Sequence, residues 1–148
     1  MDTISIVLVL FIVLECLNVI LLYKMPSSTK GNAIGVFKAY GKAKADPEIG
    51  AMVDYLVNWV AGTKLIFIVL LIGVIITGSP ATKVFSAIAL MFSIATFFSR
   101  LFPIIKRVEA EDGLTIRGYS RTLAIMIGSF IAVFALALVI FLIGYFRG

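Results

Sequence analysis

The chain has 148 residues, 61% of them hydrophobic, and a formal net charge of +5 at pH 7. Its mean hydropathy is +1.13, and soluble domains contain only about 45–50% apolar residues. This composition excludes a soluble enzyme or a soluble nucleic-acid-binding domain, and it indicates a chain whose solvent is lipid. Histidine is absent and Cys16 is the only cysteine, so the usual zinc and haem ligand and the usual neutral-pH acid–base group are missing. We therefore expect no metal, no cofactor, no catalytic residue set and no nucleic-acid partner.

Four segments are predicted to cross the bilayer as helices. An α-helix rises 1.5 Å per residue, so about 20 apolar residues cover the roughly 30 Å of hydrocarbon. The segments that meet this requirement are 3–23, 56–77, 82–102 and 122–146. They predict an all-α, polytopic integral membrane protein, a four-helix bundle that forms one domain over 1–148, with larger loops at 24–55 and 103–121.

Turn and capping residues mark where these helices begin and end. Asp46 is a favourable N-cap, Pro47 fits the first helical position, and Glu48 suits the first turn. The second helix is therefore expected to begin well before residue 56. The other start and stop signals are Gly78-Ser79-Pro80 before the third helix and Asp112-Gly113 after it.

The distribution of Lys and Arg predicts which loops are cytoplasmic, because cytoplasmic loops carry an excess of these residues. The side of the termini and the second loop carries only Lys83 and Arg147. The opposite side carries Lys24, Lys30, Lys38, Lys42, Lys44, Arg100, Lys106, Arg107, Arg117 and Arg121. We therefore expect an N-out, C-out topology in the cell (plasma) membrane. The cytoplasmic loops should contact anionic lipid headgroups.

The first loop has two interpretations. Ala33, Val36, Phe37 and Tyr40 recur at helical spacing, which suits a short amphipathic helix on the inner leaflet. Several glycines in the same segment weaken a helix. A flexible basic loop is therefore an equal alternative.

Two ionisable residues lie deep in the predicted spans. Glu15 in the first span and Lys64 in the second are each about 3–4 Å to the cytoplasmic side of the bilayer centre. A charge at this depth costs at least roughly 2.5–3.5 kcal/mol on insertion scales, and pairing would offset much of that cost. Asn18, one helical turn from Glu15, and Arg100 on the third span complete this set of candidates for an intramembrane polar or ion site.

Three interpretations of Glu15 and Lys64 stay open. The sequence favours a structural ion pair that fixes the register of the two helices. The alternatives are a proton or ion site of a transporter, or a lysine that extends alone towards the headgroups beside a protonated glutamate. Side chains lean towards the N-terminus of their helix, so the two head groups tend to separate and the lysine must bend back to meet the acid.

A stripe of polar residues follows one face of the third span. Ser86, Ser93, Thr96 and Arg100 are seven, three and four residues apart and share this face. Such hydroxyl groups often donate hydrogen bonds to carbonyl groups of their own helix, which is the interpretation we favour here. Ser93 and Thr96 are nevertheless candidates for lining a polar cavity.

Small residues indicate helix-packing faces. Gly62 and Gly73 lie on one stripe of the second span, roughly opposite Lys64, which predicts that this span is a central helix with neighbours on two sides. In the fourth span Ala124, Gly128 and Ala132 form a small-xxx-small run of the kind found at helix interfaces in membranes.

The layout resembles two families of membrane protein in part. The lone Glu15 in the first of four helices is similar to that of the small multidrug exporters. The chain length, the long first cytoplasmic loop and Arg100 resemble the membrane-associated enzymes of eicosanoid and glutathione metabolism. The arginine-rich Asn-x-x-Glu stretch of those enzymes is missing, and this chain has Asp54 and Asn58 without arginine. The likeness therefore covers layout and transfers no active site.

These patterns lead to three functional hypotheses. The first is a small bundle that acts through assembly, as a homo-oligomer or as a subunit of a larger membrane complex, because packing faces are present and a catalytic set is not. The alternative is a small proton- or ion-coupled transporter or channel that uses Glu15. The third is a membrane enzyme that handles a lipophilic substrate near Arg100.

Overall fold

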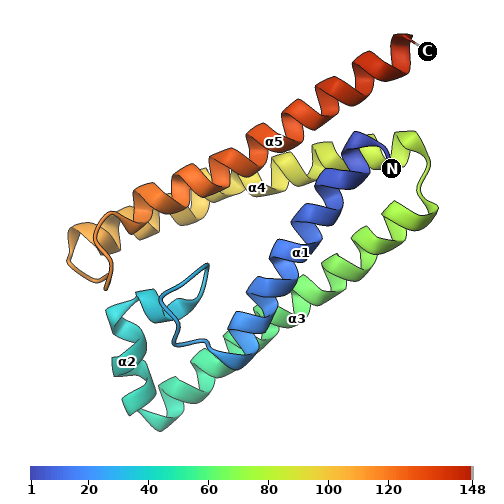
Figure 1. Cartoon of the computed structure of the whole chain (residues 1–148). Helices are drawn as coiled ribbons and strands as arrows, with labels where there is room; N and C mark the ends of the chain where they lie inside the picture. The colour runs from blue at the N-terminus through green and yellow to red at the C-terminus, as the bar shows by residue number, and fades with distance from the viewer. Residues whose placement is uncertain (148) are drawn as a thin grey trace.

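The computed structural model describes residues 1–147, and all secondary structure elements in this range are helices (Figure 1). Four helices are long: α1 (Thr3–Lys24), α3 (Pro47–Thr77), α4 (Pro80–Ala110) and α5 (Tyr119–Arg147). Each is long and apolar enough to cross a membrane. Two short elements, the 3-10 helix η1 (Ile34–Val36) and α2 (Lys38–Ala45), lie between α1 and α3. The chain is a four-helix membrane bundle, as the sequence predicts.

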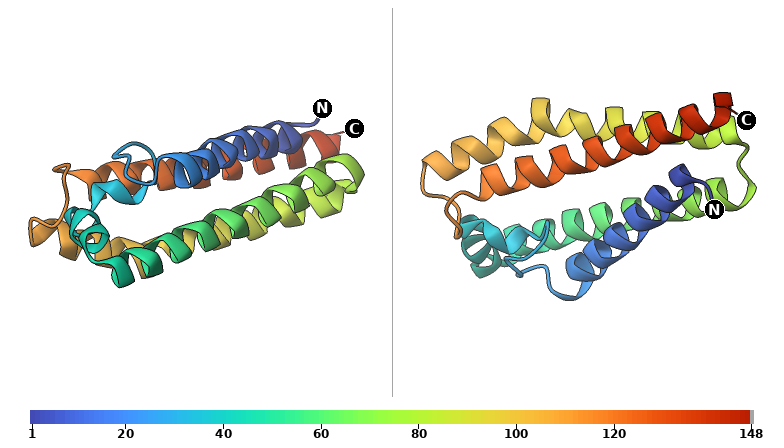
Figure 2. Two further views of the ribbon diagram at one scale, coloured as in Figure 1. Left: turned by 90° about the horizontal axis from the view of Figure 1, so that it is seen from below. Right: turned by 45° about the horizontal axis from the view of Figure 1, so that its top comes forward.

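The long helices form two antiparallel hairpins. α1 packs most extensively against α3, and α4 packs most extensively against α5. The hairpins meet mainly along α1 and α5, whereas α3 and α4 share few contacts although a short turn joins them. Both termini lie at the same end of the bundle as the α3–α4 turn, and α2 and the α4–α5 connection lie at the other end (Figures 1 and 2).

α1 is the innermost helix of the bundle. In its apolar window 33% of the residues are buried, against 17% in α3. The ring of Phe11 meets three aromatic rings of α3 and α5 edge-on, with centroid distances of 5.5–6.1 Å, an arrangement that aromatic pairs favour. The sequence-based prediction that the second span is the central helix is therefore wrong, because α1 takes that place and Gly73 on α3 faces open space.

Side-chain caps begin α3 and α4 where the sequence predicts. Asp46 accepts hydrogen bonds from the backbone N–H groups of Glu48 and Ile49 at 2.9 and 3.0 Å. Ser79 accepts one from the backbone N–H of Thr82 at 3.2 Å. A proline follows each cap, at a position where the N–H that it lacks has no partner within the helix.

α4 ends in two hydrogen bonds that satisfy its last carbonyl groups. The N–H of Gly113 donates to the Val108 carbonyl at 2.8 Å, and the N–H of Asp112 donates to the Glu109 carbonyl at 3.1 Å. This is the pattern of a Schellman C-cap. The left-handed position belongs to Asp112, with φ of 54°, a conformation that aspartate tolerates because its short polar side chain can bond locally.

The two larger connecting segments bind each other at the end of the bundle that carries α2, and we call these contacts the loop clamp. They are an isolated bridge between Phe37 and Leu114, a 2.8 Å hydrogen bond from the Thr115 N–H to the Val36 carbonyl, and a 2.6 Å salt bridge between Lys38 and Asp112. The bridge requires extended backbone at Phe37, which separates η1 from α2. The predicted amphipathic helix through this segment is therefore divided into two short pieces.

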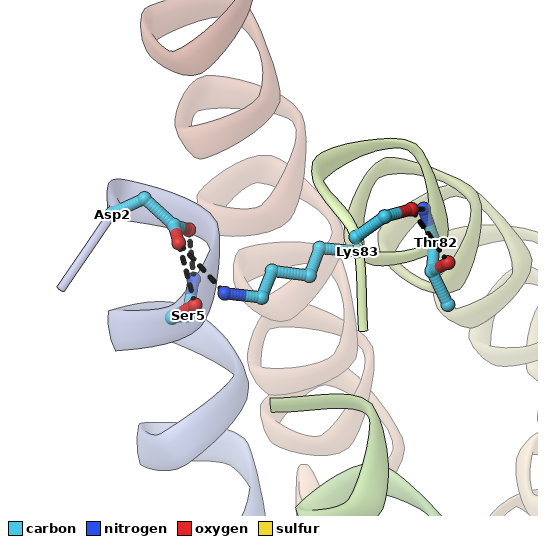
Figure 3. A network of polar contacts seen from close by, with 5 residues as sticks. Asp2, Ser5, Thr82 and Lys83 are labelled. Atoms are coloured by element: carbon cyan, nitrogen blue, oxygen red, sulfur yellow. Dashed lines mark hydrogen bonds and ion pairs between the residues drawn. The ribbon is translucent and has the colours of Figure 1, made fainter. Parts of the chain in front are cut away.

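A second polar contact, the terminal clamp, joins α1 to α4 at the opposite end (Figure 3). Asp2 accepts hydrogen bonds from the backbone N–H and the hydroxyl of Ser5, both at 2.8 Å, and from Lys83 Nζ at 3.0 Å. Burial would raise the pKa of the Asp2 carboxyl, but the hydrogen bonds from Ser5 and Lys83 outweigh burial and lower the pKa to about 2. The clamp is therefore a charged contact throughout the physiological pH range.

Candidate functional site

Glu15 and Lys64 form a salt bridge inside the bundle. Lys64 Nζ on α3 donates a hydrogen bond to Glu15 Oε2 on α1. The helices bring the two residues to the same level because α1 and α3 run antiparallel and pack closely along their length. Glu15 and Lys64 lean in opposite directions, as the sequence predicts for antiparallel helices. The four-carbon stem of Lys64 is long enough to bring its ammonium group back to the Glu15 carboxylate.

The salt bridge is neither fully enclosed nor open. The side chain of Glu15 is 20% exposed and that of Lys64 is 24% exposed, and in a bilayer this exposure is to lipid or to an internal cavity. Each charge alone would cost at least roughly 2.5–3.5 kcal/mol near the bilayer centre. The pair has no net charge, so the bundle presents a dipole and not a single charge at this depth.

A cavity of about 260 Å³ adjoins the pair between α1 and α5. The ionisable and amide side chains among its lining residues are Glu15, Lys64, Asn18 and Asn32. Its walls are otherwise apolar and include Leu14, Leu17, Leu21, Met126, Ile127 and Phe130. A mainly apolar cavity with a few convergent polar groups is the usual form of a small-molecule site.

A second cavity, of about 330 Å³, adjoins the same pair on the side of α3 and α4. Thr63 and Ser93 contribute hydroxyl groups to its lining. A third cavity of about 210 Å³ shares Phe67, Leu90 and Ser93 with the second and continues towards the α3–α4 turn. The three cavities therefore follow one another along the bundle, and the Glu15–Lys64 salt bridge lies where the first meets the second.

The other predicted site residues fall into two groups. Asn18 lines the first cavity, and its buried Oδ1 accepts no hydrogen bond from any residue in the described range. Ser93 lines the second and third cavities. Thr96 is exposed and donates its hydroxyl hydrogen bond to the Ser93 carbonyl at 2.6 Å, which is the local bonding that the sequence favours. Arg100 is exposed and lines none of these three cavities.

The predicted packing residues are used unequally within the chain. A Cβ at Gly62 would meet the Tyr23 hydroxyl at 3.7 Å, but one at Gly73 or Gly128 would meet nothing within 4 Å. Ala124 is partly buried and Ala132 is exposed. Gly73 on α3 and Gly128 on α5 therefore leave open space beside their helices.

Some residues of the site carry no signal in the sequence. Phe11 and Ile94 line both the first and the second cavity, but an apolar residue in an apolar span does not stand out. Thr63 lines the second cavity, yet its hydroxyl donates to the Trp59 carbonyl at 3.0 Å, as hydroxyl groups do in many helices. Only the packing of the four helices identifies these residues.

Comparisons of the chain with protein-family models, with curated proteins and with solved structures found no match.

Proposed function

We propose that this protein is a small transporter of the cell membrane that moves an amphipathic molecule through its bundle and uses Glu15 as a proton-binding group. One observation carries the proposal: the Glu15–Lys64 salt bridge lines two adjoining cavities, one between α1 and α5 and one on the side of α3 and α4. A purely structural pair would be expected to be packed closely on all sides. A pair that lines two adjoining cavities is instead placed where its rearrangement can change the passage between them.

The chemistry of the pair suits this role. While Glu15 is ionised, its attraction holds the Lys64 ammonium group across the boundary between the cavities. A proton on Glu15 removes that charge, and the lysine stem is then free to adopt other rotamers. The boundary can therefore open when Glu15 binds a proton and close when it releases the proton. Coupling of this kind requires that protonation favour one arrangement over the other.

The test is a flux measurement with purified protein in liposomes that contain a pH-sensitive dye. A library of small amphipathic molecules is added under a pH gradient, and compound-dependent proton flux is recorded. We expect flux with the wild-type protein and none with Glu15→Gln, although the helical content of the variant is unchanged. Glu111→Gln is the matched control, because Glu111 is exposed beyond the end of α4. If no compound produces flux, or if Glu15→Gln retains it, the proposal is wrong.

Assembly is a second candidate function, and the open space at Gly73 and Gly128 favours it. Small residues on a lipid-facing surface permit close approach of another helix. Native mass spectrometry after gentle extraction tests this candidate. A homo-oligomer that dissociates in Gly128→Leu but not in Gly144→Leu would support packing through the middle of α5, and a stoichiometric foreign subunit would indicate an accessory protein. A monomer under all conditions would contradict this function.

A further inference from the structure

We propose that the cavity between α1 and α5 binds an uncharged, single-chain amphiphile whose head group is a hydroxyl. This inference deepens the proposed function, because it names the class of molecule that the transporter would carry. It rests on the proposed function for the step of movement but not for the step of binding. Four features of the cavity lead to it: its opening, its size, its net charge and an acceptor without a donor.

The cavity opens sideways into the membrane. Leu14, Leu17 and Met126 belong to its wall and are 37%, 55% and 37% exposed. Because these residues lie within membrane-spanning helices, the part of their exposed surface that lies outside the cavity contacts lipid chains. A ligand dissolved in the bilayer can therefore enter between α1 and α5 without crossing the aqueous phase. Gly31 and Asn32 of the first loop line the cavity as well, which places it in the half of the bundle that carries the basic loops.

The volume of about 260 Å³ selects for a narrow molecule. It lies at or below the lower limit of the roughly 300–1,000 Å³ that is typical of sites for drug-sized ligands. A single hydrocarbon chain fits such a space beside leucine and methionine side chains. A phospholipid with two chains and a large head group does not.

The charges that line the cavity select for a ligand without net charge. Glu15 and Lys64 neutralise each other through their salt bridge. A cationic ligand would have to displace Lys64 from Glu15, and an anionic ligand would have to displace Glu15 from Lys64. Either exchange would leave a charge of the protein unpaired at a depth where unpaired charges are unfavourable. A neutral head group leaves the salt bridge intact.

Asn18 provides the specific contact. Its Oδ1 is buried and has no donor among residues 1–147, whereas nearly all buried polar atoms in proteins have a partner. A hydroxyl group can donate one hydrogen bond to this oxygen and can accept one in return, because it carries both a donor and acceptor lone pairs. A ketone or an ester lacks the donor that Asn18 Oδ1 requires.

Photolabelling tests this proposal without the need for transport. Three probes of equal chain length carry a photoreactive group in mid-chain and end in a hydroxyl, a carboxylate or an ammonium group. Each is added to the full-length protein in phosphatidylcholine nanodiscs, and the labelled peptides are identified by mass spectrometry. We expect the alcohol probe to label the peptides around Leu17 on α1 and Met126 on α5, and an unlabelled long-chain alcohol to compete with it.

The variant Asn18→Leu keeps the branched side-chain shape and removes the acceptor, so labelling should fall about three- to tenfold, the effect of one neutral hydrogen bond. Asn58→Leu is the matched control, because Asn58 is an exposed asparagine of α3 that lines none of the three cavities. Where Asn18→Leu fails to fold, the comparison of the three probes on the wild-type protein decides.

Labelling that is stronger with the acid or the amine, that spreads evenly over the lipid-facing surface of α3, or that persists in a folded Asn18→Leu would overturn the inference. Alcohol-selective labelling in a protein that shows no proton flux would support this ligand site and contradict the transporter. Flux of other compounds without alcohol labelling would do the reverse.

Discussion

Removal of one member of the Glu15–Lys64 pair is expected to destabilise the bundle more than removal of both. Removing one partner of a buried ion pair typically costs about 3–5 kcal/mol, but replacing both by apolar residues of similar volume is often neutral. The side chains here are 20% and 24% exposed, which places the effect at the lower end of this range. We expect Lys64→Met to lower the free energy of unfolding by about 3 kcal/mol, because it leaves a short carboxylate that cannot reach the headgroups.

Glu15→Leu should cost less, about 2 kcal/mol, because the flexible stem of Lys64 lets its ammonium group move towards the interface. The double variant should lie within about 1 kcal/mol of the wild type. The two single changes are therefore expected to be strongly non-additive, as residues in direct contact are.

The assay is reversible unfolding in mixed micelles of increasing denaturing detergent, followed by circular dichroism. The control is Lys42→Met, which changes an exposed lysine of α2 and should stay within about 0.5 kcal/mol of the wild type. Additive effects of the two single variants would refute the reasoning, since they would mean that Glu15 and Lys64 do not stabilise each other.

Three further predictions concern residues outside the Glu15–Lys64 pair. The pKa of Asp2 is lowered to about 2. Its contribution to stability is therefore present above the ordinary carboxyl pKa and is lost as the pH falls towards 2. The melting temperatures of the wild type and of Asp2→Asn should differ by a constant amount between pH 5 and 8. A Cβ at Gly35 would overlap a backbone carbonyl oxygen, whereas one at Gly41 in α2 would meet nothing. Thermal unfolding should show that Gly35→Ala destabilises by about 1–3 kcal/mol or more and that Gly41→Ala stabilises by about 0.5–1 kcal/mol; equal effects would contradict the packing at Gly35. The basic loops are proposed to hold anionic lipids, so native mass spectra should show retained phosphatidylglycerol. Arg117 and Arg121 are exposed, and Arg117→Gln and Arg121→Gln should each reduce the amount of lipid retained. An unchanged amount would mean that the lipid binds elsewhere.

The fold could be predicted because it depends on properties that each segment carries alone. The length and hydropathy of an apolar run decide whether a helix can cross a bilayer, and caps such as Asp46 and Ser79 bond to residues two or three positions away. The same local character explains the behaviour of Thr96, whose hydroxyl bonds within its own helix. Such features require no knowledge of which helices are neighbours.

The site could be predicted only where an isolated residue would be costly. Glu15 and Lys64 stand out because a membrane makes each of them unfavourable without a partner, and the structure brings them together. The cavities depend on how four helices pack, and an apolar residue such as Phe11 gives no sign of lining two of them. Arg100 shares a helical face with Ser93 in the sequence but lies outside the cavities, because residues seven positions apart are separated by about 10 Å along the helix.

The positions of the polar contacts restrict how the bundle can open. The terminal clamp of Asp2 and Lys83 joins α1 to α4 at one end, and the loop clamp of Val36–Lys38 and Asp112–Thr115 joins the two hairpins at the other. The Glu15–Lys64 salt bridge, by contrast, lies within one hairpin, between α1 and α3. Under the proposed transport function, movement that breaks only this salt bridge would widen the passage between the cavities while both ends of the bundle stay joined. Access to one side then requires the release of one clamp, and simultaneous release of both would be needed to part the hairpins. Under the proposed transport function, the two clamps and the salt bridge would divide the opening of the bundle into separate steps, which is what transport without leakage requires.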